Sequence, residues 1–234
     1  MVDRGAAELG GNVTMWVNGE PIERYGAKLK MEYTSSGYEL ENSAFKGRGR
    51  SSFVLLNSSI GFKTLTIPLV FEGCRPHDVE QKKSLFDMQV YGKNELIMDD
   101  GYMYSAYLSQ IGDAVHPHPN MLEVTYTFVG VKHGPLVTVQ ANTIYCDSTL
   151  PHTDCILTAT VGQTGSNYQM GTVTFLQVTQ GEVLTVDGIN KRILVDGAPA
   201  AERAEWITFP SLSPGKNIIT CTDPLTVEFY PVYF

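Results

Sequence analysis

Short runs of β-branched and aromatic residues, separated by turn signals, fill the second half of the chain and leave no segment for a helix longer than a turn or two. Asp187-Gly188, Asp196-Gly197 and Ser213-Pro214-Gly215 are among these turn signals. The predicted strands are 136–140, 155–161, 171–178, 182–186, 191–195, 205–209, 216–221 and 225–230. Short strands at this spacing are typical of a β-sandwich, so we expect residues 136–234 to form one.

The stretch from Gly130 to Pro135 is the best candidate for a domain boundary, because it combines Gly130, Gly134 and Pro135. Residues 131–135 are predicted to be a linker. The segment 13–130 before it combines strands with one helix and is expected to be an α+β domain. Residues 1–12 are small and polar, and they are predicted to be a flexible tail. The fold class expected is therefore mainly β, with a strand-rich first domain and a sandwich as the second.

The segment 78–91 is predicted to be the helix. Pro76 precedes it, Asp78 can serve as its N-cap, and Gly92 can adopt the left-handed conformation that ends many helices. The side chains expected to face the core are Val79, Leu85, Phe86 and Val90.

Several strands of the first domain are also visible in the pattern. Residues 13–17 are followed by Asn18-Gly19, which favours a two-residue hairpin turn, and 28–33 is the expected returning strand. Leu65, Ile67, Leu69 and Phe71 alternate and predict one buried face of a strand. Pro68 lacks an amide hydrogen, so this strand is expected to lie at a sheet edge or to carry a bulge.

The charge balance argues against nucleic acid as a specific ligand. The chain has 17 Lys and Arg against 25 Asp and Glu, and its formal net charge is −8. That sign opposes binding through phosphate neutralisation. The sequence also lacks an apolar run near the roughly 18 residues that a membrane helix needs, and its start lacks a secretory-signal layout, so an intracellular origin is expected.

No catalytic motif is found in the sequence. It lacks G-x-S-x-G, H-E-x-x-H and a phosphate-binding loop, and its cysteines do not have zinc spacing. We therefore expect four buried thiols, with a Cys146–Cys155 bridge left open. His116 and His118 could bind a transition metal together with Asp113, which keeps a metal-dependent hydrolase as a minor alternative, but a solvent-exposed loop explains them better. No catalytic residue, metal site or cofactor is predicted.

The polar, glycine-rich segment 34–52 is expected to be a flexible loop. It carries the basic residues Lys46, Arg48 and Arg50, which on an acidic chain suggest either a solvated loop or half of an electrostatic interface.

The order of elements, together with two local motifs, resembles the distal tail proteins (Dit) of long-tailed phages. The motifs are Phe209-Pro210-Ser211-Leu212-Ser213-Pro214-Gly215-Lys216-Asn217 and the strand Val124–Phe128 before the Gly-Pro linker. The resemblance covers about residues 13–234. It implies a tail-tube-like belt domain at 13–130 and a galectin-like sandwich at 136–234.

The resemblance also implies a function and partners. The chain would be a structural protein rather than an enzyme, forming a homo-hexameric ring at the distal end of the tail tube and connecting the tube to the baseplate. Its partners would be the tail-tube protein, the tape-measure protein and the tail-associated hub or lysin. DNA would pass through the ring without specific binding. The location would be the virion tail tip, after assembly in the host cytoplasm. Lys46, Arg48 and Arg50 would lie on an inter-subunit arm.

A carbohydrate-binding protein that recognises a host surface is the main alternative. Its sugar-stacking candidates are Tyr168 and Trp206. Residues 136–234 lack the H-x-N-x-R and W-x-x-E-x-R elements through which galectins bind sugar, and this argues against direct galactoside binding.

Overall fold

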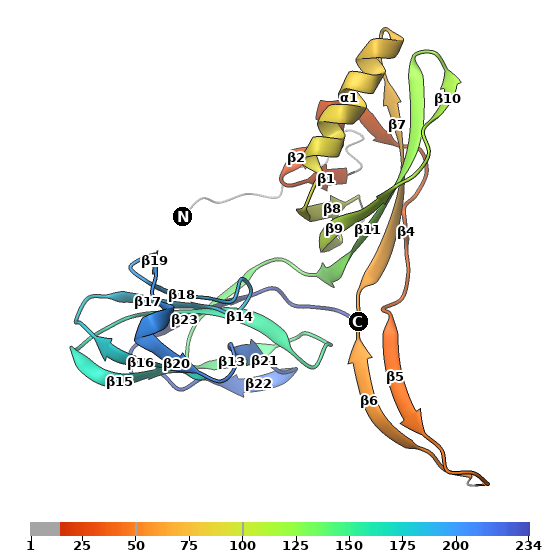
Figure 1. Cartoon of the computed structure of the whole chain (residues 1–234). Helices are drawn as coiled ribbons and strands as arrows, with labels where there is room; N and C mark the ends of the chain where they lie inside the picture. The colour runs from red at the N-terminus through yellow and green to blue at the C-terminus, as the bar shows by residue number, and fades with distance from the viewer. Residues whose placement is uncertain (1–14, 50, 100) are drawn as a thin grey trace. The chain divides into compact units, whose positions relative to one another are not determined.

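The computed structural model describes residues 15–49, 51–99 and 101–234. The chain divides into two compact units, of which the first ends at Lys132 and the second begins at His133. Strands dominate both units, and one α-helix occurs among the described residues (Figure 1). The prediction of a mainly β fold with one helix is therefore confirmed. No helix in the described part of the chain is both long and apolar enough to cross a membrane.

Unit 1 is built on one large antiparallel sheet. Its strands lie in the order β2 (Glu20–Pro21), β1 (Met15–Val17), β8 (Lys93–Met98), β9 (Met103–Ile111), β11 (Met121–His133), β7 (Lys63–Glu72) and β3 (Ala27–Leu29). In addition, β10 (Val115–His118) pairs with β11, and β4 (Thr34–Ser35) pairs with β7.

The long pair β7–β11 forms the centre of this sheet. The predicted alternation in β7 is confirmed, since Leu65, Ile67, Leu69 and Phe71 are all fully buried. Directly opposite them on β11 lie Phe128, Tyr126, Val124 and Leu122, which are buried too. Facing apolar rows of this kind fix the register, because a shift by one residue would expose every one of these side chains.

The expectation that Pro68 marks an edge or a bulge is wrong, because β7 has neighbours on both sides. The physical reason is that the neighbour on one side is interrupted. β3 pairs with Leu69–Phe71 and β4 with Leu65–Thr66, so Pro68 faces the gap between them. Its carbonyl accepts a bond of 2.9 Å from the amide of Lys30, and no donor is required from its nitrogen.

The helix α1 (Pro76–Gln89) covers one face of the sheet (Figure 1). It starts two residues before the prediction, with Arg75 as N-cap and Pro76 in the first turn, so the assignment of Asp78 as N-cap is wrong. Proline suits the first helical position because its missing amide hydrogen has no partner there. Gly92 has the expected positive φ of 95°.

Phe86 anchors α1 to the sheet. Its ring lies 5.2 Å from that of Tyr126 and 5.7 Å from that of Phe71, measured between centroids. The expectation that Leu85 packs beside it is wrong, because Leu85 is 56% exposed. Successive helical residues point about 100° apart, so the face defined by Val79, Phe86 and Val90 leaves Leu85 outside.

The predicted turn at Asn18-Gly19 is present, with φ of 53° and 81°. The predicted returning strand at 28–33 is wrong. β1 pairs instead with the two-residue strand β2, which passes into a 3-10 helix at Ile22–Tyr25. The following strand β3 pairs with β7, where Ala27 lies opposite Phe71.

Unit 2 is built from strands alone, apart from a 3-10 turn at Ala201–Arg203. Its main sheet has the order β12 (Val137–Gln140), β23 (Leu225–Phe229), β14 (Thr153–Thr160), β17 (Val183–Asp187), β18 (Arg192–Val195) and β19 (Ala198–Pro199), with β21 (Ser211–Leu212) beside β14. A second sheet contains β15 (Gly165–Met170), β16 (Val173–Val178) and β20 (Ala204–Trp206), and β13 (Thr143–Cys146) pairs with β22 (Gly215–Ile218).

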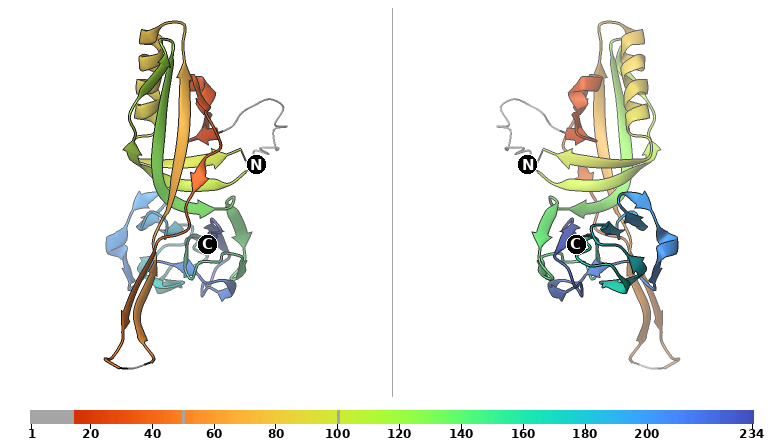
Figure 2. Two further views of the ribbon diagram at one scale, coloured as in Figure 1. Left: turned by 90° about the vertical axis from the view of Figure 1, so that its right-hand side faces the viewer. Right: turned by 90° about the vertical axis from the view of Figure 1, so that its left-hand side faces the viewer.

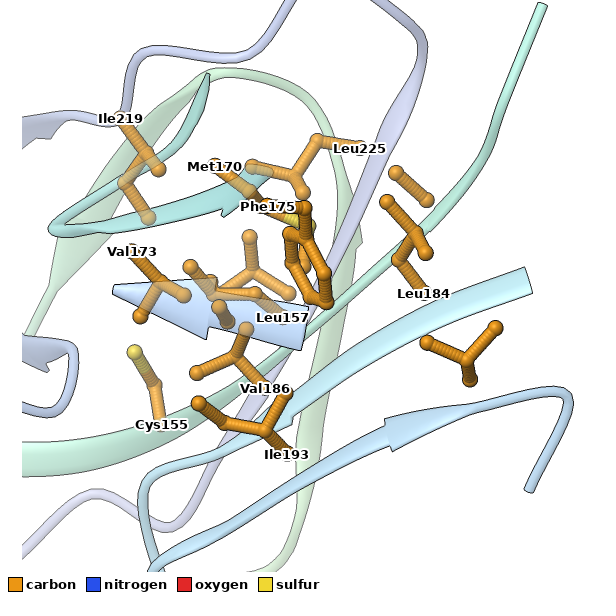
Figure 3. Close-up of a cluster of buried hydrophobic side chains, with 14 of the residues drawn as sticks. Cys155, Leu157, Met170, Val173, Phe175, Leu184, Val186, Ile193, Ile219 and Leu225 are labelled. Carbon is orange, nitrogen blue, oxygen red and sulfur yellow. The ribbon is translucent and has the colours of Figure 1, made fainter. Parts of the chain in front are cut away.

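One core joins these sheets. Leu157, Val186 and Ile193 come from the main sheet, while Met170, Val173 and Phe175 come from the second (Figure 3). All belong to the same buried cluster, as expected for a sandwich. The sequence pattern misses β13 and places β15 partly in a turn at 162–167. Polar strands of this kind are formed by pairing, here Gly165 with Val178, rather than by apolar alternation.

Candidate assembly interface

A two-stranded ribbon projects from unit 1 beyond its sheet, and we call residues 36–62 the arm (Figure 2). It consists of β5 (Leu40–Phe45) and β6 (Val54–Ile60), which pair only with each other. The expectation of a flexible loop at 34–52 is therefore wrong, because this segment contains β4 and β5. Its polar residues Glu41, Asn42 and Ser43 pair with equally polar partners on β6, which conceals the strands from a pattern search.

The arm continues a hairpin that begins inside the sheet. Thr34 pairs with Thr66 there, and the amide of Ser36 donates to the carbonyl of Thr64 over 2.9 Å. Further out, Leu40 lies opposite Ile60 in the same register. From Ser36 to Phe45 the arm reaches about 30 Å at the usual rise of a strand.

Large apolar side chains cover the end of the arm, which we call the apolar tip. These residues are Phe45, Phe53, Val54, Leu55 and Leu56, and each is at least 51% exposed. A two-stranded ribbon has no interior in which to bury them, and such a ribbon is marginally stable alone in water. Clustered exposed apolar side chains of this kind are typical of a binding surface.

Basic residues lie beside the apolar tip. Lys46 and Arg48 are exposed, and neither forms an ion pair with a described residue. The third basic residue predicted for this loop, Arg50, lies outside the described residues. The sequence thus located the charged end of the arm but not the strands that carry it.

Aromatic residues and lysines fasten the base of the arm to the sheet. Tyr38 is 8% exposed, and Nζ of Lys63 lies 4.4 Å from its ring centroid. The ring of Phe62 meets that of Tyr107 on β9 edge-on, with 6.3 Å between centroids. Burial, reinforced by the charge of Lys132, lowers the pKa of Lys63. These contacts give the arm a defined direction relative to the sheet.

The two sugar-stacking candidates are not brought together. Tyr168 lies on β15 and Trp206 on β20, and β16 separates these strands. Tyr168 is half-buried and its hydroxyl donates to Oδ2 of Asp223 over 3.0 Å. Trp206 is 40% exposed, with its ring 5.9 Å from that of Phe209.

His116 and His118 lie on the exposed strand β10. Nε2 of His116 is 3.2 Å from Oε1 of Glu80, and the side chain of His118 accepts a bond from the amide of Asn120. Among the described residues, no three His, Cys, Asp or Glu side chains are grouped closely enough to hold a metal ion.

The described geometry defines a class of protein: a β-rich chain of two units, with a long apolar-tipped arm on the first. No protein-family model and no curated protein sequence matches the chain. Solved structures do match it. The Dit protein of phage SPP1, described as a paradigm of the hub adsorption apparatus in phages that infect Gram-positive bacteria, aligns with 94% of this chain and 99% of its own, at a TM-score of 0.72 and 16% identity.

Chains of the phage p2 baseplate in its activated conformation are also similar. With strontium the TM-score is 0.56 at 8% identity, and with calcium it is 0.52 at 10% identity; both matches cover 90% of this chain and 92% of the other. The chain therefore has the fold of a phage distal tail protein. The resemblance noted in the sequence is confirmed at the level of the fold.

Proposed function

We propose that this chain is a structural protein of a phage tail, which forms a ring at the distal end of the tail tube and connects the tube to the baseplate. The observation that carries the proposal is the arm, whose apolar tip is exposed on an isolated chain. The fold shared with the SPP1 Dit protein over nearly the whole length supports it. In this proposal the chain is not an enzyme and works without a cofactor.

The proposed ring is a homo-hexamer. A closed ring requires each subunit to offer two different surfaces, one to each neighbour, and the arm is suited to be one of them. We assign the ring contacts to a belt domain at 13–130. Residues 136–234, which we propose to be galectin-like, would face the rest of the baseplate.

The proposed partners are the tail-tube protein, the tape-measure protein and the tail-associated hub or lysin. The chain would assemble in the host cytoplasm and reside at the virion tail tip. The net charge of −8 suits a ring through which DNA passes, since like charge on the lumen disfavours binding of phosphates.

Native mass spectrometry over a range of concentrations tests this proposal. We expect a species of about 155 kDa, six times the chain mass of 25.8 kDa, and negative-stain images should show a ring with an open centre. Replacing Lys46, Arg48 and Arg50 by Glu should weaken the ring and leave the fold intact. A chain that stays monomeric, both alone and with the tail-tube protein, would contradict the proposal.

Carbohydrate binding is the second candidate. It is favoured by Trp206, which is partly exposed beside Phe209, with the 97% exposed Ile207 following it in the chain. A glycan array tests it. Binding that is saturable and lost on Trp206→Ala would support this candidate.

A further inference from the structure

The sheet of unit 1 has a free edge next to the end of α1. β8 begins at Lys93, which pairs with Tyr107 of β9. Beyond Tyr107, β9 continues to Ile111, and no described strand pairs with it on that side. A hollow of about 410 Å³ lies here, lined by Tyr91, Gly92 and residues 107–111. We call this hollow the β9 notch.

Apolar side chains surround the β9 notch. Tyr91 is 84% exposed, Tyr107 47% and Ile111 38%. Outside the lining of the notch, on the last turns of α1, Met88 and Leu85 precede Tyr91 at intervals of three residues and are also more than half exposed. Unit 1 thus exposes two separate apolar surfaces, the apolar tip and the β9 notch, and the ring of Phe62 covers only part of Tyr107 in the notch.

The two surfaces match in backbone chemistry. The arm is a two-stranded ribbon whose outer edges have free backbone groups, and the β9 notch contains a strand with one unpaired edge. Adding an extended segment to such an edge is a recurrent mode of recognition, in which main-chain bonds give affinity and side-chain hollows give specificity.

The charges at the two surfaces are also complementary. Lys46 and Arg48 flank the apolar tip without an ionic partner among the described residues. Asp113, two residues beyond Ile111, is exposed and likewise forms no ion pair with a described residue. An arm whose tip lies in the β9 notch can bring its basic end to this carboxylate.

The size of the arm shows what such a contact can contribute. One face of a ribbon about 30 Å long and roughly 10 Å wide offers about 300 Å², whereas a stable interface buries about 800 Å² per partner. The tip alone therefore supplies only part of this area, and the remaining area must come from direct contacts between the sheets of neighbouring copies.

We propose that the apolar tip of one copy docks into the β9 notch of the next copy, where it adds a strand to the free edge of β9 at residues 108–111. This inference rests on the proposed ring and names the surface that receives each arm. The contact is heterologous, because the arm and the notch are different surfaces of the same chain.

Two full-length variants test the pairing. The arm variant carries Phe53→Asp and Leu55→Asp; the notch variant carries Tyr91→Lys and Ile111→Lys. Matched controls place charges of the same sign elsewhere on unit 1: Ser58→Asp in the polar middle of the arm, and Gln81→Lys at an exposed position of α1, ten residues before Tyr91. Thermal unfolding should show that all four variants remain folded, because every replaced side chain is at least partly exposed.

Each test variant alone should be monomeric, and both controls should assemble like the wild type. A 1:1 mixture of the two test variants should give a dimer of about 52 kDa, because the intact arm of the notch variant can enter the intact notch of the arm variant. Nothing larger should form, because the other arm and the other notch of this dimer are both disrupted. Assembly of the notch variant alone would overturn the inference. A mixture that stays monomeric would overturn it as well.

A cross-link separates this inference from the proposed function. With p-benzoyl-phenylalanine at position 53, irradiation should join the arm to residues 85–111 of another copy. If rings form but position 53 cross-links to another region, the notch is not the acceptor of the arm, and the proposed ring still holds. If the copies form open filaments that cross-link to residues 85–111, the notch is the acceptor and the closed ring is contradicted. The absence of any self-association or cross-link, even at high concentration, would overturn the inference and point to another virion protein as the partner of the arm.

Discussion

The backbone amide of Lys132 donates a hydrogen bond of 3.2 Å to the hydroxyl of Tyr38. Lys132 is the last residue of unit 1, and Tyr38 lies at the base of the arm. The ammonium group of Lys132 also lies 3.0 Å from the ring centroid of Tyr102. A single residue near the end of β11 therefore holds both the start of the arm and the loop before β9.

Replacing Tyr38 should loosen the arm at its base. Tyr38→Ala removes a buried ring and its contact with Lys63, so we expect a loss of about 3–4 kcal/mol in the stability of this region and faster proteolysis within 36–62. Tyr38→Phe keeps the ring and loses only the hydroxyl, at a cost of about 1 kcal/mol. Limited proteolysis followed by mass spectrometry measures the difference, and equal cleavage of wild type and Tyr38→Ala would contradict the anchoring role.

The sequence predicts the parts of this fold in which local pattern and burial agree. The alternation of Leu65, Ile67, Leu69 and Phe71 identifies the central strand, and α1 is found to within two residues at each end. The arm escapes prediction because its middle pairs polar residues with polar residues. Its apolar residues stand at the tip, where one chain offers nothing to bury them.

The candidate interface, too, could be predicted from the sequence only in part. Lys46 and Arg48 stand out in the sequence because charge is visible without structure. The β9 notch is invisible there, because it exists only through the difference in length between β8 and β9. Leu85 shows a different limit: its apolar side chain favours burial, but the helical period turns it about 100° from Phe86, outside the face that meets the sheet.

Gly130 should tolerate no side chain. A Cβ at this position would lie 2.5 Å from Cα of Ala106, on the backbone of β9. Gly130→Ala must therefore push the two strands apart, and we expect a loss of about 1–3 kcal/mol in unfolding free energy. Gly37→Ala is the control, since a Cβ there meets nothing within 4 Å. Urea unfolding of both variants checks the prediction, which an unaffected Gly130→Ala midpoint would contradict.

Tyr126 should make unit 1 sensitive to alkali. Burial, together with the hydrogen bond of 2.7 Å to Oδ1 of Asp87, raises the pKa of Tyr126 well above its usual range. Because the raised pKa belongs to the folded state, its contribution is fully present below about pH 10, the unfolded value, and is lost as the pH rises further.

We therefore expect Tyr126→Phe to cost about 1 kcal/mol at pH 7 and to flatten the decline of stability above pH 10. Tyr145→Phe is the control, because Tyr145 is 78% exposed. Urea midpoints at pH 7 and at higher pH measure both effects. A wild type and a Tyr126→Phe variant that decline in parallel would show that Tyr126 is not responsible.

Asp187 should make unit 2 sensitive to acid. It is 5% exposed, and burial by itself would raise its pKa. Two hydrogen bonds from Asn190, each 2.8 Å, and the guanidinium of Arg192 outweigh burial, so the pKa of Asp187 is lowered. The stability that this carboxylate contributes is present above the unfolded pKa of about 3.9 and is lost as the pH falls through the folded value.

Asp187→Asn should accordingly cost about 1–3 kcal/mol at pH 7, since it replaces a buried charge that holds its partners in place. The difference between the variant and the wild type should begin to shrink below about pH 4 and should vanish as the pH falls through the folded pKa of Asp187. Asp154→Asn provides the comparison, because the exposed Asp154–Lys191 pair should contribute less than about 1 kcal/mol. Chemical unfolding between pH 3 and pH 7 measures the difference, and a constant gap between Asp187→Asn and wild type would contradict the assignment.

The four cysteines should differ widely in reactivity. All are free thiols in the structure, including Cys146 and Cys155, for which the sequence left a bridge open. The expectation that all four are buried is wrong, because Cys74 is exposed and Cys221 is only partly buried. Cys74 is exposed, whereas burial, reinforced by the charge of Asp154, raises the pKa of Cys155 to about 12. At pH 8 only about one Cys155 in 10⁴ is then a thiolate, which is the reactive form.

Iodoacetamide should therefore label Cys74 first and Cys155 only after unfolding, and Cys74→Ser should abolish the fast phase of labelling. Unreduced chain unfolded in guanidinium should take up label at all four positions; uptake at two alone would reveal a bridge, and rapid native labelling of Cys155 would contradict its burial.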